Sequence, residues 1–150
     1  ILAAELPGCR WLDLCSGSGA MACEALLQGA LWVQAVERNP KIAAAARRNF
    51  QGLGERWQGN WSLEISTVER WLQRSCPEPF DLIYADPPYA AGLYAPMVEL
   101  IRAGGWLKRD GQLLMECGRD AMPLPPKGWQ QTKERRYGRS VVLQWELEAG

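Results

Sequence analysis

Hydrophobic and polar positions follow two alternating patterns along this chain. Short apolar runs typical of buried strands are separated by stretches in which apolar residues recur at helical spacing. The predicted strands cover Cys9–Leu14, Leu31–Val36, Ser62–Ser66, Phe80–Ala85 and Gly111–Glu116. The predicted helices between them cover Ala20–Leu27, Pro40–Phe50, Val68–Arg74 and Tyr94–Ala103. This alternation predicts stacked βαβ units and a mostly parallel sheet with helices on both faces.

The last part of the chain follows a different pattern. Two strand-like segments, Trp129–Arg136 and Ser140–Glu146, flank Tyr137-Gly138-Arg139 and predict an antiparallel hairpin that closes the sheet. The proline-rich stretch Met122–Gly128 is predicted to be the loop before this hairpin. The sequence contains no repeat or linker, so we expect residues 1–150 to form one domain.

Composition excludes several classes of protein. The 150 residues are 47% hydrophobic and 23% charged, as in a soluble globular domain, and no apolar run is long enough to cross a bilayer. The five cysteines include no Cys-x-x-Cys pair, which favours free thiols in a reducing, cytoplasmic compartment. The absence of histidine excludes Ser-His-Asp hydrolysis and disfavours a zinc site. We expect a cytoplasmic monomer without a metal and without membrane contact.

Charge and the first residues add two expectations. The net charge is zero, but residues 51–100 carry a net −4 and residues 101–150 a net +3. A basic face near the C-terminus suits contacts with phosphates, although it also fits an ordinary solvated surface. The sequence begins with Ile1 rather than Met, and Ile1–Glu5 is typical of the last turn of a helix. We therefore expect the N-terminal segment of the full protein to be absent from this sequence.

A glycine-rich loop, Leu12–Gly19, joins the first predicted strand to the first predicted helix. Its glycines let the backbone approach a ligand at the carboxyl end of the sheet. Glu37 ends the second predicted strand, where an acid binds ribose in nucleotide-binding folds. The glycine spacing fits NAD and S-adenosylmethionine alike, but Asp13 would repel a pyrophosphate and suits the ammonium and sulfonium of S-adenosylmethionine. S-adenosylmethionine is thus favoured, against the alternative that Asp13 is a turn residue and Glu37 a surface charge.

The second motif is Asp86-Pro87-Pro88-Tyr89, directly after the fourth predicted strand. An exocyclic amine of a nucleobase is a poor nucleophile because its lone pair is delocalised into the ring. The Asp86 carboxylate and the Pro87 carbonyl can accept its two N–H bonds and direct the lone pair at a methyl group. The two prolines fix the loop, and Tyr89 offers a flat face on which a flipped base can stack. The alternative is a proline-rich turn with an ordinary acid.

With both motifs placed, the chain resembles the bacterial 16S ribosomal RNA guanine-N2 methyltransferases. The resemblance rests on Leu12–Ala20, Glu24-Ala25-Leu26 with Gly29-Ala30, Val36–Asn39, Asp86–Tyr89 and Tyr137-Gly138. It implies a Rossmann-like class I methyltransferase fold, S-adenosylmethionine as cofactor, and the N2 amine of a guanine as methyl acceptor. It also implies ribosomal RNA or the small ribosomal subunit as partner.

The resemblance assigns expected roles to individual residues. The loop glycines would line the methionine part of the cofactor, with Asp13 near its ammonium, Glu37 on the ribose and Arg38 beside the adenine. The family usually has Asp or Asn where this chain has Thr67, and it usually begins with some tens of partly basic residues that are not present here. The candidate cofactor-binding residues are Asp13, Cys15, Ser16, Gly17, Ser18, Gly19, Glu37, Arg38, Thr67 and Val68. The candidate catalytic residues are Asp86, Pro87, Pro88 and Tyr89, and those for RNA are Tyr89, Lys133, Arg135, Arg136 and Arg139.

Three other functions stay open on the sequence alone. The same chemistry could act on an adenine or cytosine amine in DNA or in another RNA. An NAD-dependent oxidoreductase is disfavoured by Asp13 and the missing histidine, and a non-catalytic cofactor- or RNA-binding module by the intact Asp86–Tyr89 motif. Most of the eight tryptophans are predicted to pack in the core, whereas Trp57 and Trp61, expected in a loop, could instead stack on RNA.

Overall fold

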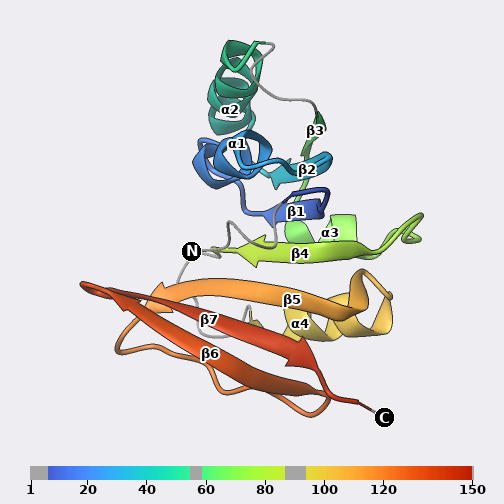
Figure 1. Cartoon of the computed structure of the whole chain (residues 1–150), viewed down its shortest axis with the longest axis vertical. Helices are drawn as coiled ribbons and strands as arrows, with labels where there is room; N and C mark the ends of the chain where they lie inside the picture. Colours follow the sequence, from blue (N-terminus) through green and yellow to red (C-terminus); the bar gives the residue numbers. More distant parts are fainter. Residues whose placement is uncertain (1–6, 55–58, 87–93, 150) are drawn as a thin grey trace.

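The computed structural model describes residues 7–54, 59–86 and 94–149. In this part of the chain a twisted sheet has the strand order β3-β2-β1-β4-β5-β7-β6 (Figure 1). Its strands are β1 (Arg10–Leu14), β2 (Trp32–Glu37), β3 (Asn60–Ile65), β4 (Phe80–Ala85), β5 (Leu107–Gly118), β6 (Trp129–Tyr137) and β7 (Ser140–Leu147). The helices are α1 (Ala20–Leu27), α2 (Pro40–Gly52), α3 (Val68–Leu72) and α4 (Tyr94–Ala103). Strands β1 to β5 pair in parallel, and β7 pairs antiparallel with β5 and β6, which confirms the predicted architecture.

Several element boundaries differ from the sequence prediction by one or two residues, and the largest difference is at the start of β5. Strand β5 begins at Leu107 rather than Gly111, because the sheet register passes from Phe80–Leu107 directly to Leu82–Gln112. The polar residues in between form a bulge, and the Lys108 ammonium lies 3.0 Å from a carboxylate oxygen of Asp81 at the start of β4. Helix α3 ends at Leu72 rather than Arg74.

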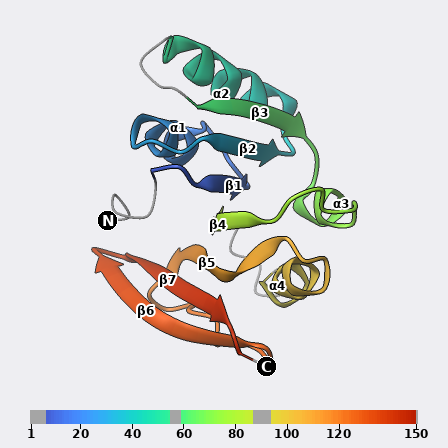
Figure 2. The ribbon, with the colours of Figure 1, turned by 45° about the vertical axis from the view of Figure 1, so that its right-hand side comes forward.

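Alternate side chains of the parallel strands enter two separate cores, one on each face of the sheet. Helices α1 and α2 lie on one face of the sheet, and α3 and α4 on the other (Figure 2). In β1, Trp11 belongs to the core under α1 and α2, whereas Leu12 and Leu14 belong to the core under α3 and α4. Helices α1 and α2 approach the sheet closely because their buried positions are mainly small, as at Ala22 and Ala46. Both faces of the sheet centre are therefore covered by packed hydrophobic side chains, which leaves the ends of its strands for ligand access.

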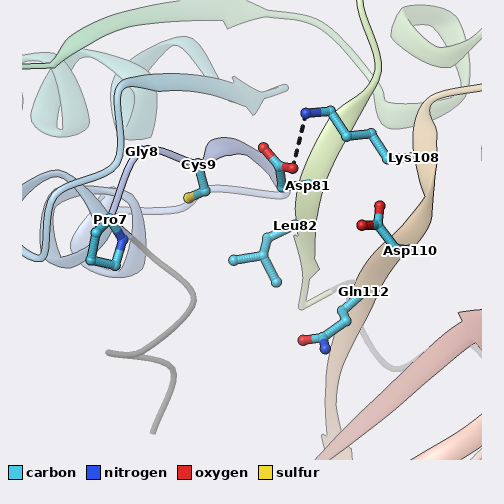
Figure 3. A pocket seen from close by; sticks show the side chains of 8 residues that line it. All are labelled: Pro7, Gly8, Cys9, Asp81, Leu82, Lys108, Asp110 and Gln112. Atoms are coloured by element: carbon cyan, nitrogen blue, oxygen red, sulfur yellow. Dashed lines mark ion pairs between the residues drawn. The ribbon is translucent and has the colours of Figure 1, made fainter.

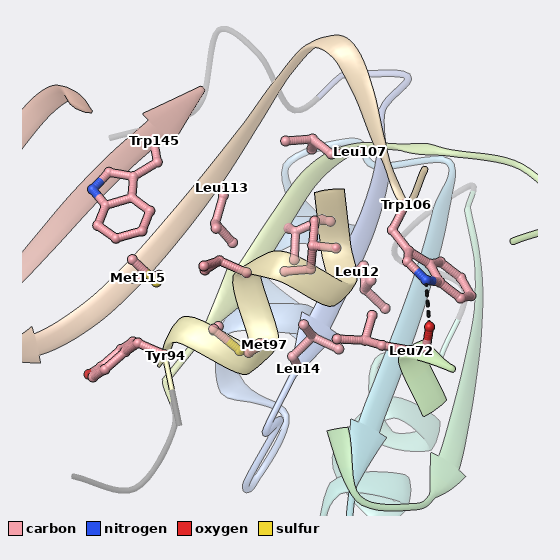
Figure 4. Close-up of a cluster of buried hydrophobic side chains, with 14 of the residues drawn as sticks. Leu12, Leu14, Leu72, Tyr94, Met97, Trp106, Leu107, Leu113, Met115 and Trp145 are labelled. Atoms are coloured by element: carbon pink, nitrogen blue, oxygen red, sulfur yellow. Dashed lines mark hydrogen bonds between the residues drawn. The ribbon is translucent and has the colours of Figure 1, made fainter. Parts of the chain in front are cut away.

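Tryptophans build much of the second core, on the face covered by α3 and α4 (Figure 4). The Trp106 ring lies 4.4 Å from that of Trp71, centroid to centroid, and its Nε1–H donates to the Leu72 carbonyl at 3.0 Å. The same core contains Trp145, which is fully buried, and Trp129. The prediction that most tryptophans pack in the core is confirmed for these side chains.

Trp61 corrects the prediction of a loop tryptophan free to stack on RNA. It lies in β3, and its ring stacks on Phe50 of α2 with the centroids 4.7 Å apart. The Arg47 guanidinium covers the same ring at 5.8 Å from its centroid. Its aromatic surface is thus used in packing, while Trp57 lies outside the described residues.

The turn of the C-terminal hairpin lies at the carboxyl edge of the parallel strands. Gly138 and Arg139 form a two-residue turn, and Gly138 has the positive φ of 60° that a type II′ turn requires at its first position. Gly118, at the end of β5, pairs with Ser140, and the Arg119 N–H donates to the Arg139 carbonyl at 3.1 Å. The closed end of the hairpin is therefore on the same edge as the ends of β1, β2 and β4.

Candidate active site

A pocket of about 580 Å³ opens at the carboxyl ends of β1 to β4. The strand order reverses there between β1 and β4, and such switch points are where open α/β sheets bind ligands. Its volume falls in the ordinary range for small-molecule sites. The lining residues that the sequence predicted are Cys15, Gly17, Glu37, Arg38, Thr67, Val68 and Asp86. Those that it missed are Val36, Asn39, Ile42, Ser66, Glu69 and Met97.

The glycine-rich loop has a left-handed backbone at three positions. Cys15, Gly17 and Gly19 have φ values of 59°, 58° and 79°. At Gly19 an added Cβ would lie 3.3 Å from the ring of Phe50, so the loop also needs a small residue there to pack on α2. The Ser16 N–H donates to the Val36 carbonyl at 2.9 Å and ties the loop to β2. Cys15 and Gly17 line the pocket, whereas Ser16, Ser18 and Gly19, also predicted to bind the cofactor, are not among its lining residues.

Glu37 joins the two loops that form one wall of the pocket. One carboxylate oxygen accepts the Gly17 N–H and the other accepts the Asn39 N–H, each at 2.9 Å. Its side chain is buried, yet it lines the pocket. A carboxylate oxygen has two lone pairs, so each retains one acceptor position for a ligand hydroxyl. Asn39 also caps α2, where its Oδ1 accepts the Lys41 N–H at 2.9 Å.

Asp13 lies beneath the loop rather than in the pocket wall. It is 1% exposed, and Ser16 Oγ donates to its Oδ2 at 3.4 Å. The pKa of Asp13 is raised to about 8, mainly by burial and to a lesser extent by the carboxylates of Asp86 and Glu37, while the hydrogen bond from Ser16 opposes this rise. A cation bound in the pocket would counteract this effect and favour the ionised form. Asp13 is thus a carboxyl group whose charge depends on what binds nearby.

Asp86 directly follows β4, and Glu37 is the last residue of β2. Strand β1 lies between these two strands, and both residues line the pocket. Partial burial raises its pKa, and the neighbouring Glu116 on β5 raises it further. The Tyr84 hydroxyl donates to Glu116 and holds that carboxylate in place. The remaining motif residues, Pro87, Pro88 and Tyr89, lie outside the described residues.

Thr67 has a structural use that accounts for a hydroxyl residue at this position. It is the N-cap of α3, where its Oγ1 accepts the Arg70 N–H at 3.2 Å. Asp, Asn and Thr all serve as N-caps, so the departure from the usual family residue keeps the local fold. The Ser66 N–H donates to the Glu37 carbonyl at 3.1 Å, and Ser66 and Thr67 both line the pocket.

The predicted RNA-binding residues divide between the two faces of the hairpin. Arg135 pairs with Val142, which also pairs with Glu116, so these side chains share one face. Arg136 pairs with Val141 of the opposite core and forms an ion pair with Glu134 at 3.0 Å. Within the described chain, Lys133, Arg135 and Arg139 form no ion pair. These three basic side chains therefore lie on the same face of the sheet as Asp86 or at the carboxyl edge beside it.

A second hollow of about 330 Å³ lies at the amino ends of the strands (Figure 3). It is lined by Pro7, Gly8, Cys9, Asp81, Leu82, Lys108, Asp110 and Gln112. Parallel α/β sheets bind ligands at the opposite edge, and the Lys108–Asp81 ion pair occupies this one. The pocket at the carboxyl edge is therefore the candidate functional site.

Residues 7–54, 59–86 and 94–149 contain neither a metal-binding cluster nor a membrane-spanning helix. No group of three or more His, Cys, Asp or Glu side chains there is arranged to hold a metal ion. No helix in those ranges is long and apolar enough to span a membrane.

Sequence comparison relates the chain to methyltransferases that act on RNA. A protein called ribosomal RNA small subunit methyltransferase D from Escherichia coli is 25% identical over 149 residues, which cover 99% of this chain and 73% of that protein. Its namesake from Buchnera aphidicola is 26% identical and covers 89% of this chain and 69% of its own. A tRNA1(Val) (adenine(37)-N6)-methyltransferase from Edwardsiella ictaluri is 28% identical, over 76% of this chain and 49% of its own.

Solved structures and a protein family give the classification. A protein from Escherichia coli assigned as a methyltransferase superimposes with a TM-score of 0.87 at 25% identity, over 99% of this chain and 82% of its own. Magnesium protoporphyrin IX methyltransferase from Synechocystis, solved with bound S-adenosylmethionine, shares the fold, with a TM-score of 0.72 at 16% identity over 97% of this chain and 73% of its own. The family described as conserved hypothetical protein 95 matches residues 1–146. The chain therefore belongs to the conserved hypothetical protein 95 family and has the fold of the class I methyltransferases.

Proposed function

We propose that this chain is an S-adenosylmethionine-dependent methyltransferase whose acceptor is the N2 amine of a guanine in 16S ribosomal RNA. The observation that carries the proposal is that one pocket is lined by the glycine-rich loop, the Glu37 carboxylate and Asp86. The first two form a nucleotide-binding wall, and the third supplies a carboxylate where a second substrate would enter. The names of the relatives support RNA, and specifically small-subunit ribosomal RNA, as that substrate.

The residues of the pocket fit the proposed cofactor. Gly17 lets its backbone approach the amino-acid part, Glu37 keeps acceptor positions for ribose hydroxyls, and Ile42 and Met97 offer apolar surface for the adenine. The Glu37 carboxylate, together with Asp13 once a bound cation favours its ionised form, would supply negative potential, which suits a cation and repels a pyrophosphate. When bound, the cofactor supplies an electrophilic methyl group attached to a positively charged sulfur.

Asp86 would act on the acceptor. Its carboxylate would accept an N–H of the exocyclic amine, so that the nitrogen lone pair turns away from the ring and toward the methyl group. The same carboxylate would stabilise the positive charge that grows on nitrogen during transfer, which is the point at which fixed charges lower a barrier most. A neutral amide at this position would retain the shape but lose the charge.

The test is methyl transfer to small-subunit ribosomal RNA from cells that lack this protein. We expect the purified chain to incorporate the methyl group of S-adenosylmethionine, and mass spectrometry of the digested RNA to identify N2-methylguanosine at one position. Asp86→Asn should lower kcat by at least about 100-fold with cofactor affinity unchanged, whereas Asp120→Asn, on an exposed turn, should have no effect. Calorimetry should detect binding of S-adenosylmethionine but not of NAD. Unaltered turnover in Asp86→Asn would refute the assigned role.

A second acceptor is favoured by one observation, the similarity to a methyltransferase whose name specifies adenine N6 in a tRNA. The cofactor pocket and Asp86 alone do not distinguish the two amines. The same digest decides between them, because N6-methyladenosine and N2-methylguanosine separate as different nucleosides.

A further inference from the structure

A second carboxylate lies beside Asp86 on the same face of the sheet. In the parallel pairing of β4 and β5, Ala85 lies opposite Met115, so the next positions, Asp86 and Glu116, are also side by side. Neighbouring strands are about 4.8 Å apart. Both side chains follow, by two positions, residues of the core under α1 and α2, namely Tyr84 and Leu114, and they therefore point the same way.

Glu116 is held in place by one oxygen only. The Tyr84 hydroxyl donates to its Oε2, and Tyr84 is itself fixed by stacking on Trp11 with the ring centroids 6.0 Å apart. No described residue donates a hydrogen bond to Oε1. Glu116 thus presents a fixed, negatively charged acceptor at the edge of the sheet where Asp86 would meet the amine.

We propose that Glu116 selects guanine by accepting the N1–H next to the amine that Asp86 engages. This inference rests on the proposed function and names the residue that would set its specificity. Guanine carries two adjacent donors on its Watson–Crick edge, N1–H and the N2 amine, and two adjacent carboxylates match them.

The other two exocyclic amines do not match this pair. Beside its N6 amine adenine has N1 as an acceptor, and beside its N4 amine cytosine has N3 as an acceptor. Either lone pair would face the carboxylate of Glu116 and repel it. A site built to bind an N–H rejects an analogue that lacks it far more strongly than a site that discriminates by shape alone. The pair of carboxylates therefore distinguishes guanine from both alternative acceptors.

The experiment uses 2-aminopurine in place of the target guanine, in a fragment of ribosomal RNA that carries the methylated position. This analogue keeps the N2 amine but has an unprotonated N1. We expect the wild-type chain to prefer guanine over 2-aminopurine by about 100-fold in kcat/KM, and Glu116→Gln to reduce this preference to less than about 10-fold. The glutamine amide can donate a hydrogen bond to the N1 of the analogue. The variant should therefore lose less activity on the 2-aminopurine RNA than on the guanine RNA.

The preference is a ratio measured on one enzyme preparation, so a lower folded fraction cancels from it. The analogue also lacks O6, but this loss affects the wild type and the variant alike and cancels when their two ratios are compared. Should turnover of Glu116→Gln be too slow to measure, the ratio of dissociation constants for the two RNAs gives the same comparison. Glu134→Gln, on an exposed strand of the hairpin, is the matched control and should keep the wild-type ratio. An unchanged ratio in Glu116→Gln, with normal methylation of guanine by the wild type, would overturn this inference alone. No methylation of the guanine RNA by the wild type would instead contradict the proposed function.

Discussion

Replacement of Asp13 by Asn should make the stability of the domain less dependent on pH. Folding raises the pKa of Asp13 from 3.8 to about 8, so between these values the folded chain binds a proton that the unfolded chain has released. The free energy of unfolding of the wild type therefore falls as pH rises through this window, by at most about 1.4 kcal/mol per pH unit from this group. Between pH 4 and pH 7 the loss is on the order of 4 kcal/mol.

Asparagine is neutral at every pH and escapes this loss. Its amide oxygen can keep the hydrogen bond from Ser16, while burial of its NH2 group costs about 1–3 kcal/mol. The variant should thus be slightly less stable than the wild type at pH 5 and more stable, by about 2 kcal/mol, at pH 8. Urea unfolding followed by tryptophan fluorescence at both pH values measures the difference.

The control for this experiment is Asp120→Asn, which removes an exposed carboxylate and should leave the pH dependence as it is. If Asp13→Asn and the wild type lose stability in parallel from pH 5 to pH 8, Asp13 does not titrate as described, and the reasoning fails. The same variant should bind S-adenosylmethionine at least about tenfold more weakly, because it loses the carboxyl group that a bound cation would ionise. A gain in stability together with a loss of affinity is expected of a charge that is kept for binding.

Three other outcomes follow from contacts in the fold. Gly19→Ala should weaken cofactor binding, as measured by calorimetry, because the new Cβ would press on Phe50 at a backbone φ of 79°. Arg135→Ala should lower RNA affinity and reduce the slope of log K against log salt by about one. Arg136 is already paired with Glu134 on the other face of the hairpin, so Arg136→Ala should change neither quantity. Equal effects of the two substitutions would contradict the assignment of RNA contacts to the face that carries Arg135. Trp106→Phe should lower the free energy of unfolding by about 1–3 kcal/mol in urea titration, since a buried carbonyl loses its donor.

Much of the fold was predictable because its signals are local. The parallel strands show as apolar runs, and the turn residues Gly19 and Gly138 mark real left-handed positions. The site was predictable where a residue type is tied to a strand end, as for Glu37 and Asp86. These positions need only the order of elements along the chain, which the apolar pattern supplies.

The unpredicted features depend on register between strands. The bulge of β5 is polar, and its sequence is typical of a turn. Only the structure shows that Lys108 in this bulge pairs with Asp81 on the neighbouring strand. Glu116 sits beside Asp86 only because Ala85 and Met115 pair, which no local pattern reports. The buried position of Asp13 beneath the loop is likewise a consequence of three-dimensional packing. Such contacts join positions far apart in sequence.

The orientation of the C-terminal hairpin allows its turn to change in length without a change in the pocket. Its turn at Gly138 and Arg139 lies at the substrate edge, while Trp129 and Leu147, which pair at its open end, lie at the opposite edge. Residues inserted into the turn would extend the molecule beyond this edge without altering the pairing of β5 with β7 or the residues that line the pocket. Descendants of one ancestor could thus acquire new RNA targets by lengthening a single loop, while the machinery that holds the methyl donor stays the same.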